Sequence, residues 1–579
     1  MRKLTTLLLT LSIFTCSVNA QITETATDAV KNMGLGWNLG NTLDAYTCAT
    51  TDVTSDSYWG CQGLESETCW GQPKTTKGLI TMMKNAGFGA VRVPVTWYPH
   101  MDKSGNVNAQ WMARVKEVVD YVIDNGMYCI LNVHHDTGAD NSSFTSWIKA
   151  DETYYTNNKT RYELLWKQIA TEFKDYDNHL IFEAYNEMLD VKNSWCYASF
   201  NASGQYDATI ATSAYNAINN YGQSFVNVVR QTGGNNTSRN LILNTYCAAT
   251  GYGTWSSHLK EPVTKINLPE DSSAGHLIFE VHDYPNILTD NNTKERTLSD
   301  IKSEVDGTIS FLNNNLVSKG APVIIGEWGT SNVDAGDGKT DYDSHPDLMK
   351  QFAEYFVEKC KANNIATFYW MGLTDGSYRS IPAFNQPDLA ECLAKAYHGS
   401  DYQGDYPDGS SDASSVTAFD GEKALAWGSA LSIDSKTLQM VGYPLTVTIT
   451  YKQTASGPDI QFWDGQWGNK ITVIVDGKSY NGDFNPQSVY GTSAGTEHTT
   501  SITFDETTYN TLAQKGFLFQ GTGVTIYKVV LTSDATTGIA SVESADRKMT
   551  EAVYNLAGQR ISKPSRGMYI KNGKVYMAR

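Results

Sequence analysis

Residues 322–329 read PVIIGEWG, a short apolar run that ends beside a carboxylic acid, Glu327. Three β-branched residues in succession, with a Pro before them and a Gly after them, are typical of a strand buried on both faces. A carboxylate buried beside such a strand costs free energy unless a cation or hydrogen-bond donors compensate for it. The stretch therefore predicts a strand of a sheet covered on both sides, with an acid at its carboxyl end for a chemical purpose.

Seven other segments between residues 34 and 372 follow the same pattern. In chain order the eight are GLGWNLGN (34–41), AVRVPVTW (90–97), YCILNVHH (128–135), LIFEAYNE (180–187), NLILNTY (240–246), HLIFEVHDY (276–284), PVIIGEWG (322–329) and ATFYWMG (366–372). Helix-patterned stretches separate most of them, for example TTKGLITMMKNAG (75–87) and MARVKEVVDYVIDNG (112–126). Strands that alternate with helices predict right-handed βαβ units and a parallel sheet. Eight such units predict an α/β fold, a (β/α)8 TIM barrel.

An open, doubly wound sheet is the alternative to a barrel. It is disfavoured because no GxGxxG or GxxxxGK[ST] phosphate-binding loop follows any of the eight segments. Polar residues instead stand near the carboxyl ends of most strands, where barrel enzymes assemble their active sites. These residues are Asn41, Arg92, His134, His135, Asn186, Glu187, His282, Tyr284, Glu327 and Trp370. Their repeated placement predicts a single site at one end of the barrel.

Two of these residues, Glu187 and Glu327, are acids at the ends of different strands. Paired carboxylates across a pocket can cleave a glycosidic bond: one protonates the leaving oxygen, and the other attacks the anomeric carbon or activates water. The two roles need different proton affinities, and Arg92 can keep Glu327 charged. Asn186 can bind the sugar 2-hydroxyl, and Tyr284 can orient Glu327. The set therefore predicts glycoside hydrolysis.

The three histidines at the strand ends admit two interpretations. His134, His135 and His282 can donate hydrogen bonds to sugar hydroxyls or to the carboxylates, while Trp370 offers a flat face to a sugar ring. Together with Glu327, the histidines could instead bind a catalytic metal ion. Adjacent side chains on one strand point to opposite faces, so we expect only one of His134 and His135 to line the site. This argues against the metal, and we expect no cofactor.

Residues 1–20 have the features of a secretory signal peptide. A basic start precedes an apolar centre at residues 7–14 and a small-residue cleavage site at residues 18–20. Cys16 allows a lipoprotein leader as the alternative, but the residues before it fit a lipid-attachment box poorly. No later apolar stretch approaches the length of a membrane span. The formal net charge of −17, without a strong basic run in the body of the chain, argues against nucleic acid as a partner.

The cysteines suit an exported protein, because export permits disulfides. Cys48, Cys61 and Cys69 share one polar loop and could supply one bridge, and Cys196 could pair with Cys247. No CxxC or other metal-type spacing occurs, which disfavours a structural zinc site.

The composition changes after the predicted catalytic domain, residues 21–400. The expected order is a linker at 401–415, a β-sandwich at 416–533 and a small β tail domain at 534–579 with two or three strands. The sandwich prediction rests on short β-rich runs divided by Gly or Asp turns, and its type is a jelly roll. Its candidate glycan-binding residues are Trp427, Trp463 and Trp467, with core packing as the alternative role for each.

The motifs of the barrel resemble glycoside hydrolase family 5. The matching stretches are GWNLGNTLD (36–44), ETCWGQPKTT (67–76), VRVPVTW (91–97), LNVHHD (131–136), FEAYNE (182–187), HDY (282–284), GEWG (326–329) and FYWMG (368–372). The first two are most similar to the subfamily 4 endo-β-1,4-glucanases. The resemblance implies a retaining barrel enzyme with Glu187 as acid/base and Glu327 as nucleophile. It also implies a supporting shell of Arg92, His134, Asn186, His282, Tyr284 and Trp370, with Asn41 and His135 as substrate contacts.

The two downstream regions resemble known modules as well. GEKALAWG (421–428) and KGFLFQGTGVTIYKVVL (515–531) resemble jelly-roll carbohydrate-binding modules. VYNLAGQR (553–560) and GMYIKNGK (567–574) resemble the C-terminal sorting domains of type IX secretion in Bacteroidota. That resemblance implies the outer-membrane secretion machinery as a partner.

We therefore expect a secreted, monomeric endo-β-1,4-glucanase of a Gram-negative, Bacteroidota-like cell, either free or attached to the cell surface. It would hydrolyse plant cell-wall polysaccharide of the cellulose type by double displacement. Xyloglucan, mixed-linkage glucan, xylan and mannan stay open as preferred substrates. The alternative from another class is a non-catalytic glycan-binding protein, which the presence of both Glu187 and Glu327 disfavours.

Overall fold

The computed structural model describes most of the chain between residues 22 and 533. The described ranges are 22–48, 50–200, 205–289, 294–332, 340–409 and 415–533, with the strand segments 553–555, 560–561, 567–571 and 574–578. The predicted leader at residues 1–20 lies outside them. Within these ranges, no helix is both long enough and apolar enough to cross a lipid bilayer.

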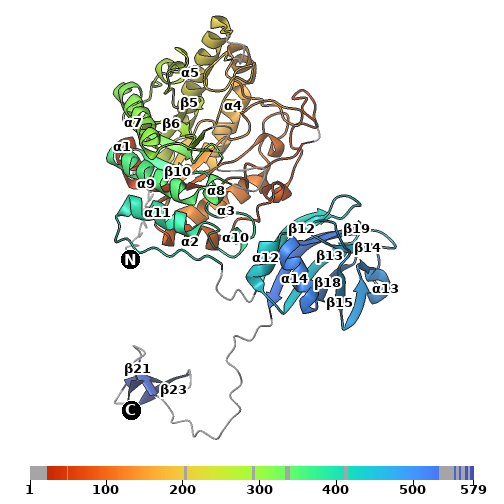
Figure 1. Ribbon diagram of the computed structural model, residues 1–579. Helices are drawn as coiled ribbons and strands as arrows, with labels where there is room; N and C mark the ends of the chain where they lie inside the picture. The colour runs from red at the N-terminus through yellow and green to blue at the C-terminus, as the bar shows by residue number, and fades with distance from the viewer. Residues whose placement is uncertain are drawn as a thin grey trace, which may run out of the picture. The chain divides into compact units, whose positions relative to one another are not determined.

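Eight parallel strands form a closed barrel in the order β1-β10-β9-β6-β5-β4-β3-β2 (Figure 1). They are β1 (Leu35–Asn38), β2 (Ala90–Val93), β3 (Tyr128–Asn132), β4 (Leu180–Glu183), β5 (Leu241–Ala249), β6 (Leu277–Asp283), β9 (Val323–Trp328) and β10 (Ala366–Tyr369). Each strand lies within or largely overlaps one of the eight predicted segments. The barrel closes where β1 pairs with β10, with Gly36 opposite Phe368. The predicted (β/α)8 barrel is confirmed for this part of the chain.

Helices alternate with the strands and surround the barrel (Figure 1). The longer ones are α2 (Lys77–Asn85), α3 (Ala109–Asp124), α4 (Glu152–Glu172), α5 (Ala208–Gln231), α7 (Leu298–Asn315), α9 (Pro346–Ala362) and α11 (Pro387–His398). Short elements in the loops are η1 (Leu64–Thr68), η2 (Tyr98–His100), η3 (Gly234–Thr237), α6 (Glu261–Lys265), β7 (Leu288–Thr289), β8 (Lys294–Glu295), η4 (Val317–Lys319), α8 (Asp341–Ser344) and α10 (Ser377–Ser380). In α3, the Asn108 side chain caps the first turn, and Trp111, Val115 and Val118 form the buried stripe.

One end of the barrel is closed by α1 (Ala26–Met33). Its buried side chains pack in one apolar cluster with residues from seven strands, namely Ala90, Tyr128, Ile130, Ile181, Ile242, Ile278, Ile324, Ala366 and Phe368. Most of these are the first or second residues of their strands. The apolar plug therefore occupies the amino ends of the strands, and the polar residues that follow the strands gather at the opposite end.

Residues 401–409, the first part of the predicted linker, continue along the barrel region. The Tyr402 ring stacks on His398 with centroids 4.3 Å apart. The Phe384 amide donates to the carbonyl of Pro407 at 2.7 Å. This part of the chain is therefore packed rather than free.

Two antiparallel sheets enclose a second core within residues 415–533. The six-stranded sheet, in spatial order, contains β11 (Ser415–Ala424), β20 (Val524–Ser533), β13 (Leu445–Gln453), β18 (Glu497–Thr503), β15 (Thr472–Val475) and β16 (Lys478–Asn481). The four-stranded sheet contains β12 (Leu431–Ile433), β19 (Phe517–Thr522), β14 (Asp459–Asp464) and β17 (Asp483–Phe484). The helices α12 (Ser435–Val441), α13 (Pro486–Tyr490) and α14 (Glu506–Lys515) connect them. The predicted strands form sheets, the three helices were not predicted, and the jelly-roll type stays a prediction.

The C-terminal unit, residues 534–579, contains a small antiparallel sheet of its own. Its strands are β21 (Val553–Asn555), β22 (Arg560–Ile561), β23 (Gly567–Lys571) and β24 (Lys574–Ala578), in the order β22-β21-β23-β24. Four strands therefore replace the two or three that were predicted.

One disulfide joins Cys48 to Cys61, so one bridge within the polar loop is confirmed. The suggested pairing of Cys196 with Cys247 is wrong, because both are free thiols. Cys196 is exposed whereas Cys247 is buried, so the two side chains lie in different environments.

Candidate active site

Arg92, on β2, is the centre of a buried hydrogen-bond network. Its Nε and Nη2 donate to the two carboxylate oxygens of Glu183 at 2.7 and 2.8 Å, and Nη1 donates to Glu327 Oε1 at 2.7 Å. Nη1 also reaches Asn38 Oδ1 at 3.0 Å, and Nη2 reaches Asn186 Oδ1 at 2.8 Å. Burial lowers the pKa of Arg92, but its carboxylate neighbours, Glu183 foremost, outweigh burial and raise the pKa well above its ordinary value. Arg92 is therefore a permanent buried cation.

Glu327, the penultimate residue of β9, has both carboxylate oxygens held. Oε1 accepts from Arg92, and Oε2 accepts from the Tyr284 hydroxyl at 2.7 Å. Its side chain is only 7% exposed. Charge-assisted hydrogen bonds from two fixed donors compensate for this burial and fix the direction of the carboxylate.

Glu187 lies in the loop beyond β4 and faces Glu327. One oxygen of each carboxylate lies within 4.8 Å of the other. The Glu187 side chain is 24% exposed, against 7% for Glu327. Glu327 is thus held by the buried Arg92 and is almost inaccessible, whereas Glu187 is partly accessible to solvent. This difference in environment suits two carboxylates with different tasks.

His282, on β6, connects Glu187 to a third acid beneath it. Its Nδ1 lies 2.9 Å from Glu187 Oε1, and its Nε2 lies 3.3 Å from Glu280 Oε1. Burial lowers the pKa of His282, but Glu327, Glu187 and Glu280 together outweigh burial and raise it to about 10. Burial and the neighbouring Glu183 raise the pKa of Glu280 above its ordinary value. At neutral pH His282 is therefore a second buried cation.

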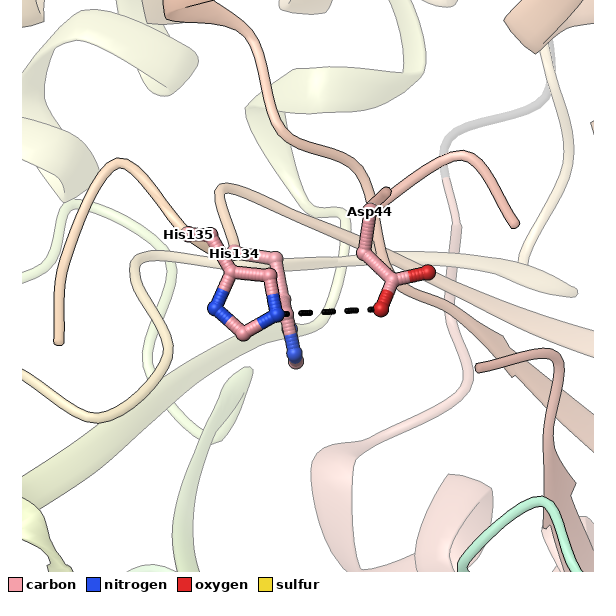
Figure 2. A group of neighbouring side chains, drawn as sticks. All are labelled: Asp44, His134 and His135. Atoms are coloured by element: carbon pink, nitrogen blue, oxygen red, sulfur yellow. Dashed lines mark ion pairs between the residues drawn. The ribbon is translucent and has the colours of Figure 1, made fainter. Parts of the chain in front are cut away.

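His134 and His135 both reach the site, so the expectation that only one would do so is wrong. The strand β3 ends at Asn132, and the strand alternation used in that argument does not apply beyond it. His134 Nε2 lies 4.0 Å from Glu327 Oε1, and His135 Nε2 lies 3.8 Å from Asp44 Oδ2 (Figure 2). Burial lowers the pKa of His134 well below its ordinary value and that of His135 to about 4. Both rings are therefore neutral at neutral pH.

Trp370 and Asn41 follow β10 and β1. The Trp370 ring lies parallel to that of His134, at 6° with centroids 5.9 Å apart. Gly40 leaves room for it, since a Cβ there would lie 2.9 Å from the indole. Asn41 has a left-handed backbone, with φ of 60°, and its amide donates to Asp44 Oδ2 at 3.1 Å. The structure thus brings every predicted barrel residue to one region.

Among the residues that the structure describes, two groups of side chains have ligand atoms close enough together to hold a metal ion. They are Asp44 with His134 and His135 (Figure 2), and Glu187 with His282 and Glu327; within each group the atoms lie within 4.8 Å. Most of these polar groups have hydrogen bonds within the chain, such as those that Asp44 accepts from the amides of Asn41 and Thr42. The geometry of both groups is thus explained by protein contacts.

Three buried acids of the site, Glu183, Glu280 and Asp44, were not singled out from the sequence. Glu183 is the last residue of β4 and Glu280 lies within β6, but later residues of the same two segments, Glu187 and His282, were chosen instead. A signal was present: the tetrapeptide LIFE occurs at both 180–183 and 277–280. An acid repeated at the end of the same apolar run predicts two carboxylates at the same height of the barrel.

Gly326 and Trp328, on either side of Glu327, have different roles. A Cβ on Gly326 would lie 1.6 Å from Glu280 Oε1, so the glycine provides the space for that acid. Trp328 is fully buried and stacks on Phe356 of α9 with centroids 4.4 Å apart. It packs against the helix layer and supports the end of β9.

A closed parallel barrel with two carboxylates facing each other at the strand carboxyl ends defines a class of barrel glycosidases. A family model agrees: Cellulase (glycosyl hydrolase family 5) matches residues 51–375. The chain belongs to glycosyl hydrolase family 5 and is a glycoside hydrolase.

Similar proteins cover the same part of the chain. It is 33% identical to Endoglucanase B of Neocallimastix patriciarum over 377 residues, which are 64% of this chain and 70% of that protein. A solved GH5-4 broad specificity endoglucanase from an uncultured bacterium is 60% identical, with a TM-score of 0.60, covering 66% of this chain and 97% of its own. A family 5 enzyme from Prevotella bryantii, solved with a xyloglucan tetradecasaccharide, is 40% identical, with a TM-score of 0.55. The match covers 65% of this chain and 100% of that one.

Proposed function

We propose that the barrel is a retaining endo-β-1,4-glucanase, with Glu327 as the nucleophile and Glu187 as the acid/base. The observation that carries this proposal is the approach of the two carboxylates to within 4.8 Å. Retaining glycosidases hold their carboxyl groups about 5 Å apart, whereas inverting ones leave roughly 6.5–9.5 Å for a water molecule. The names of the similar endoglucanases support a β-glucan substrate.

In the first step, Glu327 attacks the anomeric carbon while Glu187 gives its proton to the leaving oxygen. Arg92 and Tyr284 hold Glu327 in the direction of attack, so little reorganisation is needed at the moment of reaction. In the second step, Glu187 takes a proton from water, which then releases the sugar from Glu327. His282 stays hydrogen-bonded to Glu187 while the charge of Glu187 changes.

The other residues of the site bind the sugar whose bond is cleaved. The Asn186 amide, fixed by Arg92, is positioned to bind the 2-hydroxyl, where contacts strengthen as charge develops on the ring. Trp370 offers a flat apolar face, and His134, His135 and Asn41 contact hydroxyls. These roles require no cofactor.

The substrate is an internal β-1,4 bond of a cellulose-type glucan, with xyloglucan as the second candidate. The xyloglucan bound by the Prevotella bryantii enzyme favours that candidate. Mixed-linkage glucan, xylan and mannan complete the panel to be tested. A non-catalytic glycan-binding protein is the alternative from another class.

The rest of the chain serves export and attachment in this proposal. The signal peptide and the C-terminal sorting domain direct a monomer through the outer-membrane secretion machinery to the cell surface or the medium. Residues 416–533 bind polysaccharide and hold the barrel close to its substrate.

The test is hydrolysis of purified cellulose, xyloglucan, mixed-linkage glucan, xylan and mannan, with product sizing and proton NMR of the first product. We expect internal cleavage of at least one β-glucan and the β-anomer as the first product. An initial α-anomer would mean inversion, and no hydrolysis of any of the five would refute the enzymatic proposal.

A further inference from the structure

The outer face of the four-stranded sheet carries polar and aromatic side chains in a fixed arrangement. Along β14, Ile460 and Phe462 are buried, while Gln461 and Trp463 are half-buried on the other side. Phe462 stacks on Phe517 in the core with centroids 5.8 Å apart. The alternation thus assigns core packing to Phe462 and leaves Trp463 for the surface.

Gln461 is the centre of a polar hydrogen-bond network on this face. Its Nε2 donates to Asp483 Oδ1 at 2.7 Å, while its Oε1 accepts from Gln520 and from the Trp463 indole, both at 3.3 Å. Lys470 donates to both oxygens of Asp483 at 2.6 and 2.7 Å and neutralises it. Each amide nitrogen carries one further N–H that a ligand hydroxyl can accept.

Trp467 is presented by a tight turn next to Trp463. The buried Asp464 carboxylate accepts backbone amides of Gln466, Gly468 and Asn469 at 2.7–3.2 Å, which fixes the turn. The Trp467 ring is 44% exposed, and its centroid is 5.9 Å from that of Trp463. The planes of the two rings are inclined at 50° to each other.

Trp427 joins the same face from a second turn. The turn is closed by the Ser429 amide, which donates to the carbonyl of Ala426 at 3.0 Å. Its Gly428 amide donates to Gln520 Oε1 at 3.3 Å and so attaches the turn to the amide network. Trp427 is 54% exposed. The turn that carries the exposed Trp427 therefore adjoins the two linked glutamines, one of which contacts Trp463.

We propose that this face, formed by Trp427, Trp463, Trp467, Gln461 and Gln520, binds a single neutral β-glucan chain. The inference rests on the proposed binding role of residues 416–533 and gives it a site. Indole faces pack on the C–H faces of pyranose rings, and amides bind their hydroxyls. This face holds two carboxylates, Asp459 and Asp483, of which Lys470 pairs with Asp483, so it does not favour an anionic polymer. Because hydrogen bonds already hold the turns, binding requires little ordering.

The experiment uses the full chain carrying Glu327→Gln, so that the ligand is not hydrolysed, with calorimetric titration of cellohexaose. We expect two binding sites per chain, one in the barrel and one on this face. Adding Trp463→Ala, Trp467→Ala or Gln461→Ala should weaken the second site about tenfold or more and leave the first unchanged. Trp463→Tyr, which keeps an aromatic face, should weaken it less. Retention on insoluble cellulose should fall in the same order.

The matched control is Thr450→Ala on the outer face of the other sheet, which should leave both sites intact. The two surface variants Trp467→Ala and Gln461→Ala test the site even if Trp463→Ala fails to fold. A single binding site in the parent chain, or two sites retained in these variants, would refute the inference. Self-association that Trp467→Ala abolishes without changing glycan binding would assign the face to a second copy instead.

This result is separable from the proposed function of the barrel. With Glu327 present, the Trp467→Ala chain should hydrolyse soluble cello-oligosaccharides at the parent rate. Absence of hydrolysis by the parent chain would refute the enzyme proposal, whereas hydrolysis without a second binding site would refute only this inference.

Discussion

Arg92 Nη1 lies 2.7 Å from Glu327 Oε1 while the same guanidinium holds Glu183 through Nε and Nη2. A lysine keeps the charge but cannot form this fork. We therefore expect Arg92→Lys to lower kcat at least about 100-fold, because Glu327 loses its fixed direction. The free energy of unfolding should fall by about 2 kcal/mol, since a charge-assisted hydrogen bond to Glu183 is lost.

The matched control for this variant is Arg114→Lys. Arg114 is also buried and donates two hydrogen bonds of 2.8 Å to Glu67, but it lies on α3, outside the Arg92 network. It should lose stability and keep kcat. Thermal unfolding and steady-state kinetics on cello-oligosaccharides measure both quantities, and equal kcat losses in the two variants would refute the positioning role of Arg92.

Removing the acid/base should leave a site that an external nucleophile can rescue. With Glu187→Ala we expect kcat on glucan to fall about 1,000-fold, as general acid catalysis is lost. Aryl glycosides with good leaving groups should suffer less in the first step. Added azide should raise the rate and yield a glycosyl azide of β configuration, which NMR identifies. No rescue, or an α-azide, would contradict the assignment of Glu187.

Tyr284→Phe should separate two effects on Glu327, namely its orientation by the Tyr284 hydroxyl and its stabilisation by the charge of Arg92. The variant removes the 2.7 Å hydrogen bond to Glu327 Oε2 and leaves Arg92 in place. We expect kcat to fall about 100-fold, as for the loss of one transition-state donor, with a smaller change in KM. Tyr162→Phe, a buried tyrosine that donates to the Ala184 carbonyl, is the control and should retain kcat. An unchanged kcat in Tyr284→Phe would exclude the orienting role.

Glu280 should control the alkaline limit of activity through His282. The carboxylates raise the pKa of His282 to about 10, so its charge stabilises the fold fully below about pH 6.5 and the stabilisation is lost as pH rises through 10. Glu280→Gln removes one of these carboxylates. We expect the alkaline limb of kcat/KM to move to lower pH by about one unit or more.

The control for that shift is Asp283→Asn. Burial raises the pKa of Asp283 to about 7, but its charged neighbour is Glu304 rather than His282. The alkaline limb of kcat/KM should therefore stay at the same pH in Asp283→Asn. A limb that moves equally in both variants, or in neither, would show that Glu280 does not act through His282.

The fold could be predicted well because its signal is repeated eight times. A strand that is buried on both faces needs a short apolar run, and each of the eight runs ends in polar residues. The structure has a parallel strand at every one of these runs. The sheets in residues 415–533 were also predicted, from short β-rich runs such as the one that forms β13. Where residues 401–409 pack could not be predicted, because Tyr402 and Tyr406 stand among residues typical of a linker.

Most of the candidate site was predicted, including Arg92, His282 and Glu327 within strands, but three buried acids were missed. Glu183 and Glu280 stand in apolar runs, and only the closed barrel shows that both point at Arg92. His134 and His135 both reach the site because β3 ends at Asn132, so the alternation of side chains expected of a strand does not continue to them. Sequence reasoning assigns residues to elements, but it does not locate the residue at which an element ends.

Gly326 has a consequence for how this site can change over time. The missing side chain at 326 and the carboxyl of Glu280 occupy one volume, since a Cβ there would lie 1.6 Å from Oε1. A larger residue at 326 is therefore admissible only where position 280 has become smaller. Across the homologues of this chain the two positions should covary, and a library that randomises either one alone should return almost only the parent residue.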